Sequence, residues 1–216
     1  MLKFKPNSTV LFQGDSITDM GRGRTEDPNH LYGHGYVYHI VSKYTAEHPE
    51  DKITFYNRGV SGNTSKQILD RWEEDTIALK PDVLSLLCPV NDVGASSGCR
   101  TTAQTREAVT EMIERSFEMN PDLQLILCEP FMYLDMKTPR HEGVVLSVSL
   151  PEKQEVIREC AKKYNAIFVP FQKMFDDLAA QTGDEAYWIW DGIHPTAAGH
   201  YHMAQQWTKI VSEHLK

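Results

Sequence analysis

The sequence predicts a three-layer α/β/α sandwich, in which a parallel five-stranded sheet is covered by helices on both faces. Short apolar runs alternate along the 216 residues with longer segments of helical periodicity. Parallel neighbours need a crossover, and that crossover is normally a helix. No repeat or linker divides the chain, and 41% hydrophobic residues suffice for a sizeable core. Residues 1–216 are therefore expected to form a single domain.

Each element has its own signal along the chain. The expected strands are short apolar runs bounded by polar or turn-forming residues, at 9–13, 53–57, 83–88, 123–128 and 166–169. After Thr64, the apolar residues Ile68, Trp72 and Leu79 recur at helical spacing and predict a helix. The next helix has the face Val109, Met112, Ile113, Ser116 and Phe117, and the one after it Val156, Ile157, Cys160, Ala161 and Tyr164. A last helix has the face Tyr201, Ala204, Trp207 and Val211.

Charge and cysteine content narrow the class of protein. The net charge is −8 with acids and bases mixed along the chain, which argues against nucleic-acid and membrane partners. No apolar run approaches the roughly 18 residues of a membrane span. The N-terminal segment lacks the apolar region of a secretory signal, and the four cysteines have no CxxC spacing. We expect a cytoplasmic protein with reduced, structural cysteines.

Polar segments follow the first three expected strands. Gly14-Asp15-Ser16 follows the first strand, 58–64 the second and 89–92 the third. Far downstream, Asp191 stands three residues before His194. Ligands bind such sheets in the crevice beyond the carboxyl ends of the strands, so we expect these segments to meet there.

These residue types predict acyl transfer through a serine nucleophile. A serine hydroxyl needs a base within hydrogen-bond reach, and the base needs a partner that fixes its tautomer. Ser16, His194 and Asp191 supply these roles in that order. The backbone N–H groups of Ser16 and Gly62 and the side-chain amide of Asn91 are candidate oxyanion donors, each worth on the order of 10²- to 10³-fold in rate.

The same segments resemble the four blocks of the SGNH, or GDSL, hydrolase family. GDSITDMGR, RGVSGNT, VNDV and DGIHP occur in the family's order. The resemblance implies a flavodoxin-like fold, Ser16 as nucleophile, an oxyanion hole of the Ser16 amide with Gly62 and Asn91, and His194 as base with Asp191 behind it. Within the family, GDSITDMGR, GHGYV, NRGVSGNT and RWEEDTIALKPD are similar to the intracellular acetylxylan esterases, which deacetylate xylo-oligosaccharides.

One residue departs from the family's pattern. Pro89 stands where the third block usually has glycine, two residues before Asn91. Proline fixes φ and removes an N–H, so a different turn at this point would displace Asn91. Asp15, by contrast, is expected to shape its turn through backbone hydrogen bonds and to stay outside the chemistry.

Other segments have competing interpretations. Residues 94–98 fit the G-x-S-x-G pattern, but a nucleophile elbow joins a strand directly to a helix, so we expect a surface loop. Several histidines gather in the sequence, at His30, His34, His39, His200 and His202. No H-E-x-x-H spacing accompanies them, so neither a metal nor another cofactor is expected.

For three residues near the expected crevice, the sequence is consistent with either of two roles. Trp188 and Trp190, close to Asp191, belong either to the core or to a wall on which a sugar ring stacks. Glu129, at the end of the fourth expected strand, either lines the cleft or forms an ion pair.

We expect a serine esterase that hydrolyses small acyl esters, above all acetyl esters, of carbohydrates such as acetylated xylo-oligosaccharides through an acyl-enzyme. One rival is a lysophospholipase or thioesterase for longer acyl chains, although residues 131–150 mix charged with apolar side chains. A rival of another class is a non-catalytic sugar- or flavin-binding module. The expected partner is a small acylated molecule, and the sequence leaves the oligomeric state open, a homo-oligomer included.

Overall fold

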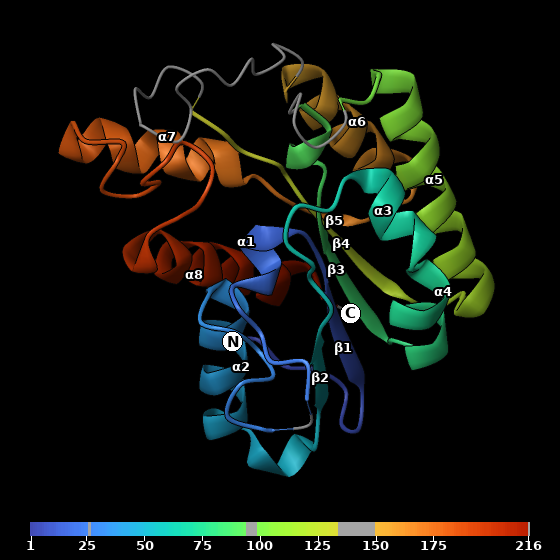
Figure 1. The fold of residues 1–216 in the computed structure, drawn as a ribbon. Helices are drawn as coiled ribbons and strands as arrows, with labels where there is room; N and C mark the ends of the chain where they lie inside the picture. Colours follow the sequence, from blue (N-terminus) through green and yellow to red (C-terminus); the bar gives the residue numbers. More distant parts are fainter. Residues whose placement is uncertain (26, 94–98, 134–149, 216) are drawn as a thin grey trace.

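In the computed structural model, the chain forms a parallel five-stranded sheet between two layers of helices, as the sequence predicts (Figure 1). The structure describes residues 1–25, 27–93, 99–133 and 150–215. The strands are β1 (Thr9–Gly14), β2 (Thr54–Asn57), β3 (Val83–Leu87), β4 (Gln124–Cys128) and β5 (Ile167–Val169). They follow the flavodoxin-like order β2-β1-β3-β4-β5. The five expected strands are confirmed, each within one residue at either end.

One face of the sheet is covered by α2 (Tyr36–Glu47) and α8 (Ala197–His214), with α7 (Phe171–Thr182) beside them (Figure 1). Phe12 of β1 and Trp207 of α8 are both fully buried, and their ring centroids lie 5.3 Å apart. Burying a side chain of this size contributes about 1.5 to 3 kcal/mol. This layer therefore fixes α8, and with it the loop that precedes α8, onto β1.

The opposite face carries α3 (Ser65–Asp70), α4 (Trp72–Asp75), α5 (Thr102–Met119) and α6 (Leu150–Lys163) (Figure 1). Trp72 is fully buried against this face, and its indole N–H donates to Ser116 Oγ at 3.2 Å. The buried faces predicted for the helices around Val109 and Val156 are confirmed in α5 and α6, except that Phe117 and Tyr164 are only partly buried and Tyr164 follows the end of α6. Cys88, Cys128 and Cys160 pack as buried free thiols, and Cys99 is exposed.

The helix predicted after Thr64 is broken into pieces. A capping box between Thr64 and Gln67 starts α3, but Arg71 leaves the helical region with φ −105° and ψ 11°. The chain then forms α4 and a 3₁₀ turn, η2 (Ile77–Leu79). The turn at Arg71 lets its side chain reach back toward the strand ends.

The structure differs from the sequence-based expectation at further helices. The short α1 (Ser16–Asp19) and the longer α2 and α7 were not predicted. Gly35 and Pro170, the residues directly before α2 and α7, provide no side-chain cap. Two 3₁₀ turns, η1 (Pro49–Asp51) and η3 (Val90–Val93), complete the described elements. In α8 the buried face includes His200, whereas Tyr201, predicted to be buried, is 49% exposed.

The strand register aligns the ends of four strands at one edge. Gly14 pairs with Leu87, Leu87 with Cys128, and Cys128 with Val169. The segments that follow these residues therefore leave the sheet side by side, where the polar segments were expected to meet. In the part of the chain that the structure describes, no helix is long and apolar enough to cross a membrane.

Candidate active site

Ser16 is placed by a tight turn at the end of β1. Asp15 caps α1, and its Oδ1 accepts a hydrogen bond from the Ile17 N–H at 3.0 Å. At Gly14 a Cβ would lie 2.4 Å from Thr18 Oγ1 and 2.6 Å from the Leu87 carbonyl oxygen, so only glycine fits. The turn therefore presents Ser16 as the first residue of α1 at the carboxyl edge of the sheet.

His194 and Asp191 complete a hydrogen-bonded series with Ser16. Ser16 Oγ lies 2.9 Å from His194 Nε2, and His194 Nδ1 lies 2.8 Å from Asp191 Oδ2. The Asp191 side chain is fully buried, whereas that of His194 is 26% exposed. Because a carboxylate can only accept, His194 donates from Nδ1, which leaves Nε2 free to accept from the Ser16 hydroxyl.

Backbone contacts fix the carboxylate of Asp191. Its Oδ1 accepts hydrogen bonds from the N–H groups of Ile193 at 3.0 Å and His194 at 2.7 Å. The turn between Asp191 and His194 requires Gly192, whose φ is +83°. Both carboxylate oxygens thus have assigned partners, and the imidazole is held in one orientation.

The two further segments predicted to donate to an oxyanion lie next to each other. Gly62 has a φ of +80°. No atom lies within 4 Å of the position that its Cβ would occupy, so the side of Gly62 on which a side chain would lie is open. Asn91 stands in η3 and donates from Nδ2 to the Asn63 carbonyl oxygen at 3.1 Å. Pro89 therefore does not separate Asn91 from the segment of Gly62.

Asp92 ties these two segments together and was missed in the sequence. It is fully buried, and its carboxylate accepts from the Ser65 N–H at 2.8 Å and the Ser65 hydroxyl at 2.6 Å. Thr105 of α5 donates to the same carboxylate at 2.6 Å. Hydrogen bonds to a charged acceptor contribute about 1.5 to 3 kcal/mol each. Asp92 thereby fixes η3 against the start of α3, three residues after Gly62.

Arg71 is the second residue that the sequence did not single out. Its guanidinium donates to the carbonyl oxygens of Gly14 at 3.0 Å and Arg58 at 2.7 Å, and to Asn63 Oδ1 at 2.8 Å. It also pairs with Asp75 at 2.8 Å. One side chain thus connects the end of β1 with both ends of the segment that follows β2. The interruption after α3 is the local signal that places it there.

Asp15 is buried next to the hydrogen-bonded series of Ser16, His194 and Asp191 but does not belong to it. Burial raises the pKa of Asp15 to about 6, against the lowering effects of its backbone hydrogen bond to Ile17 and of nearby His194. Its Oδ2 has no hydrogen-bond partner among the residues that the structure describes. The expectation that Asp15 shapes the turn agrees with its contact to the Ile17 N–H.

The residues with two expected roles are now distinguished by their surroundings. Glu129 is 3% exposed, pairs with Arg158 and accepts from the Gln172 N–H at 3.1 Å, so it is an ion-pair partner. Trp188 is 8% exposed and its indole N–H donates to Thr182 Oγ1 at 3.0 Å. Trp190 is 49% exposed, so it is the one of the two tryptophans with surface to offer a ligand.

The histidines considered for a metal have different contact partners. His30 pairs with Asp27 at 2.8 Å, His39 packs edge-on against Tyr201, and His200 is buried with its Nδ1 accepting from the Tyr36 N–H at 3.2 Å. His34 and His202 also have different neighbours: His34 donates its N–H to the Met20 carbonyl oxygen, and His202 packs against Trp188.

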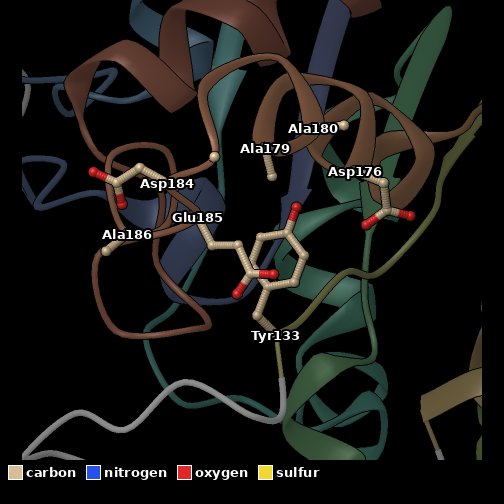
Figure 2. Close-up of a pocket in the computed structure, with 8 residues that line it drawn as sticks. Tyr133, Asp176, Ala179, Ala180, Asp184, Glu185 and Ala186 are labelled. Atoms are coloured by element: carbon tan, nitrogen blue, oxygen red, sulfur yellow. The ribbon is translucent and has the colours of Figure 1, made fainter.

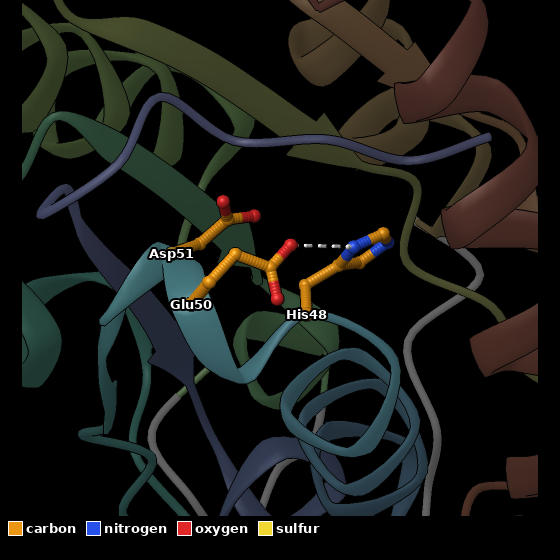
Figure 3. Close-up of side chains that lie close together, drawn as sticks. All are labelled: His48, Glu50 and Asp51. Atoms are coloured by element: carbon orange, nitrogen blue, oxygen red, sulfur yellow. Dashed lines mark ion pairs between the residues drawn. The ribbon is translucent and has the colours of Figure 1, made fainter.

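A different group, not predicted, brings potential metal ligands together. His48, Glu50 and Asp51 have ligand atoms within 4.8 Å of one another (Figure 3). The Lys3 ammonium already lies 2.8 Å from Asp51 and 3.3 Å from Glu50, so a cation is present. The group precedes β2 and therefore lies at the opposite end of the strand from Arg58 and the candidate site.

An open cavity of about 610 Å³ lies beside the loop that carries Asp191 and His194 (Figure 2). Tyr133 lines it, and the Tyr133 N–H donates to the Gly192 carbonyl oxygen at 2.8 Å. Asp176, Asp184 and Glu185 give the wall three carboxylates. Burial raises the pKa of the Tyr133 phenol above its ordinary value, with Asp176 and Glu185 adding to the shift. The cavity is therefore rich in acceptors for the hydroxyl groups of a ligand.

Two segments named from the sequence lie outside the described residues. These are residues 94–98, which contain the G-x-S-x-G match, and residues 134–149, which make up most of the segment considered for a longer acyl chain.

Comparison with known proteins gives a consistent result. A sequence model of the GDSL-like lipase/acylhydrolase family matches residues 12–201. An acetylxylan esterase from Geobacillus stearothermophilus is 32% identical over 217 residues, covering 97% of this chain and 96% of that protein.

Solved structures give the same picture. A putative GDSL-like lipase from Parabacteroides merdae has a TM-score of 0.87 at 34% identity, covering 96% of this chain and 97% of that one. The acetylxylan esterase Axe2 from G. stearothermophilus has a TM-score of 0.81 at 28% identity, covering 97% of this chain and 96% of that one. A catalytic mutant of Axe2, in which a serine is replaced by alanine, is similar with a TM-score of 0.82 at 27% identity over 97% and 96%.

Proposed function

Because this chain belongs to the GDSL-like lipase/acylhydrolase family, we propose that Ser16 is its nucleophile, His194 its general base and Asp191 the residue that orients the base. The protein is a carboxylic ester hydrolase, a serine esterase acting on acetyl esters. The observation that carries the assignment of the residues is the hydrogen-bonded series, with 2.9 Å from Ser16 to His194 and 2.8 Å from His194 to Asp191.

In the acylation step, Ser16 Oγ attacks the carbonyl carbon of the acetyl group while His194 Nε2 takes the hydroxyl proton. The charge that forms on the imidazolium is stabilised by the buried carboxylate of Asp191, which has no competing solvent around it. When the tetrahedral intermediate collapses, the same proton passes from His194 to the leaving sugar oxygen. The product is acetyl-Ser16 and a free hydroxyl on the sugar.

The negative charge on the carbonyl oxygen would be met by three donors. These are the Ser16 N–H, the Gly62 N–H and the side-chain amide of Asn91, which its contact with the Asn63 carbonyl oxygen holds next to the segment of Gly62. Asp92 and Arg71 hold the segments that carry these donors before any substrate arrives. Donors that do not have to reorganise during the reaction lower the barrier most effectively.

In the deacylation step, water takes the place of the sugar. His194 removes a proton from the water, whose oxygen attacks the acetyl carbonyl of acetyl-Ser16, and then returns the proton to Ser16 Oγ as acetate leaves. The same oxyanion donors serve both steps. No metal or other cofactor is needed for this sequence of proton transfers.

The proposed substrate is an acetylated xylo-oligosaccharide or a similar small acetylated sugar. The similarity to an acetylxylan esterase over almost the whole of both chains supports this substrate. Exposed Trp190 next to Asp191 offers an aromatic face to a sugar ring. The cavity beside Gly192 offers the carboxylates of Asp176, Asp184 and Glu185 to neighbouring sugar hydroxyls (Figure 2).

The rival functions receive less support. A lysophospholipase or thioesterase needs an apolar channel for its acyl chain, and the cavity next to the catalytic loop is lined by three carboxylates. A non-catalytic sugar- or flavin-binding module would give no reason for Ser16, His194 and Asp191 to be aligned at hydrogen-bond distances.

Acetate release from acetylated xylo-oligosaccharides of known structure tests the proposal, with Ser16→Ala as the variant and Ser61→Ala as its matched control. Ser61 is an exposed serine next to Gly62, and its N–H donates to Asp19 Oδ2 at 2.9 Å. We expect Ser16→Ala to abolish turnover and Ser61→Ala to retain it. A serine-directed phosphonate should label Ser16 alone, and a label on any other serine, Ser96 included, would overturn the assignment.

A further inference from the structure

A second cavity, of about 630 Å³, lies on the side of the sheet edged by β2 and has a different character. Its charged lining residues are Arg22, Arg24, Arg58 and Asp75, which leaves an excess of positive charge in a protein whose net charge is −8. Tyr32 and Tyr56 supply aromatic rings to the same wall. The volume falls within the range of about 300 to 1,000 Å³ typical of small-molecule sites.

Comparison with the other large cavities shows that this charge balance is specific. A cavity of about 610 Å³ along α5 also contains two arginines, Arg106 and Arg115, but four glutamates outnumber them. The cavity beside Tyr133 contains three carboxylates and no basic side chain. An anionic ligand would therefore be repelled from both and attracted to the cavity at β2.

The carboxylates around the β2 cavity are already engaged by other arginines. Asp19 accepts from Arg24 at 2.7 Å, and Asp75 accepts from Arg71 at 2.8 Å. Arg58 approaches Asp75 only to 4.0 Å, beyond hydrogen-bond distance. Among the residues that the structure describes, Arg22 and Arg58 therefore have no carboxylate within hydrogen-bond distance.

Arg22 is a buried cation with unused donors. It is 9% exposed, and its Nε donates to the Gly59 carbonyl oxygen at 2.8 Å, which fixes the guanidinium in the wall. Its two terminal nitrogens have no hydrogen-bond partner among the residues that the structure describes. Burial and then the neighbouring charge of Arg24 lower the pKa of Arg22 to about 10, with Arg58 adding to the effect. A buried guanidinium in this state is stabilised by a bound anion.

Arg58 provides a second guanidinium to the same cavity. Its Nε is buried and lacks a hydrogen-bond partner within the described part of the chain. The guanidinium carbon lies 5.4 Å from the centroid of the Tyr56 ring, so the side chain is held along that ring. Guanidinium groups bind carboxylate and phosphate oxygens through paired N–H donors, and tyrosine rings pack against the apolar faces of sugar rings.

We propose that the cavity formed by Arg22, Arg58, Tyr32 and Tyr56 binds an anionic sugar, with its carboxylate or phosphate on the two arginines and its ring against the tyrosines. This site goes beyond the proposed esterase function and does not depend on it. Both segments that build it continue into the candidate active site, since Arg22 follows Ser16 by six residues and Arg58 precedes Gly62 by four.

Isothermal titration calorimetry on the full chain at low ionic strength tests this inference without any hydrolysis. The probes are glucuronate, glucose 6-phosphate, inorganic phosphate and neutral glucose. We expect saturable binding of one or both sugar acids at a single site, weaker binding of inorganic phosphate and none of glucose. The tighter of the two sugar acids identifies whether the ligand carries a carboxylate or a phosphate. Absence of saturable binding by both acids, or equally tight binding of inorganic phosphate or glucose, would overturn the proposal.

Variants locate the binding to this cavity. Arg58→Gln should weaken binding at least tenfold, and Arg58→Lys, which keeps the charge but not the paired donors, should lie between it and the unmodified protein. The matched control is Arg115→Gln in the cavity along α5, which should leave the affinity within twofold. A circular dichroism spectrum and a thermal unfolding midpoint that match those of the unmodified protein verify that each variant is folded. Equal affinities for Arg58→Gln and the unmodified protein would exclude this cavity as the site.

Discussion

Replacing Asp191 by asparagine changes one atom in the hydrogen-bonded series and reverses the direction of its hydrogen bond with His194 Nδ1. The carbonyl oxygen of the new side chain would keep the position of Oδ1, where it accepts from Ile193 and His194 at 3.0 and 2.7 Å. The amide nitrogen would then occupy the position of Oδ2, 2.8 Å from His194 Nδ1. A donor at that point requires Nδ1 to accept, so the proton of the neutral imidazole moves to Nε2.

The opposite orientation of the asparagine amide would keep the tautomer of His194, but its energetic cost is high. It would place the NH₂ group against two backbone N–H donors, and leaving a buried donor unsatisfied costs about 1 to 3 kcal/mol each, or about 2 to 6 kcal/mol for the pair. With Nε2 protonated, His194 cannot take the proton from Ser16. Loss of the correct tautomer lowers kcat on the order of 10³- to 10⁴-fold, equivalent to about 4 to 5.5 kcal/mol of barrier.

Steady-state kinetics on 4-nitrophenyl acetate measure this effect, and we expect kcat to fall while KM changes little. The chain offers a matched control in Asp27→Asn. Asp27 has the same spacing to His30, the same 2.8 Å contact to Nδ1 and a backbone N–H on its other oxygen, but its side chain is 42% exposed, whereas that of Asp191 is fully buried. That variant should keep kcat within twofold. A decrease of less than tenfold in Asp191→Asn, or a loss confined to KM, would refute the reasoning.

Three further predictions concern the oxyanion, the buried acid and the acyl group. Asn91→Ala should lower kcat about 10²- to 10³-fold with the fold retained by circular dichroism, and a smaller effect would remove Asn91 from the oxyanion hole. Because burial raises the pKa of Asp15 from about 3.9 to about 6, the folded state binds the proton more tightly, so this residue's contribution to stability is present below pH 4 and lost as the pH rises through 6. Asp15→Asn should therefore be more stable than the unmodified protein by about 3 kcal/mol at pH 7 and equal to it near pH 4 in denaturant unfolding, whereas a difference independent of pH would contradict the raised pKa. On 4-nitrophenyl esters, kcat/KM should be highest for acetate and fall beyond butyrate, while a dry apolar channel would instead add up to about 0.8 kcal/mol for each methylene through octanoate.

Local patterns in the sequence suffice for the sheet and for the segments of the site. Each strand is a short apolar run, and a fully parallel sheet brings the segments after its strands to one edge, so Ser16 and Asn91 follow from the pattern. Gly62 is placed by the same argument. The tight spacing of Asp191 and His194 likewise indicates a side-chain pair.

Other features depend on contacts that no local pattern records. Helices α2 and α7 begin without a side-chain cap, so the usual start signal is absent. Arg71 and Asp92 act through partners that are distant in the chain, as in the contact of Arg71 with Gly14, 57 positions away. The burial of Trp188 and the ion pair of Glu129 depend on packing between elements, which is why the sequence left two roles for each.

With Ser16 as the proposed nucleophile and His194 as its base, 178 positions separate the two groups that hydrolysis requires. During synthesis Ser16 leaves the ribosome long before His194, and it has no base until the segment before α8 has been made and docked. A chain cut ahead of position 191 would contain the residues of all five strands but neither Asp191 nor His194, and we expect it to have no esterase activity. Acetate release therefore reports whether the C-terminal segment of the protein has closed onto the first strand. The fraction of completely folded molecules can therefore be measured from turnover alone, without any spectroscopic probe.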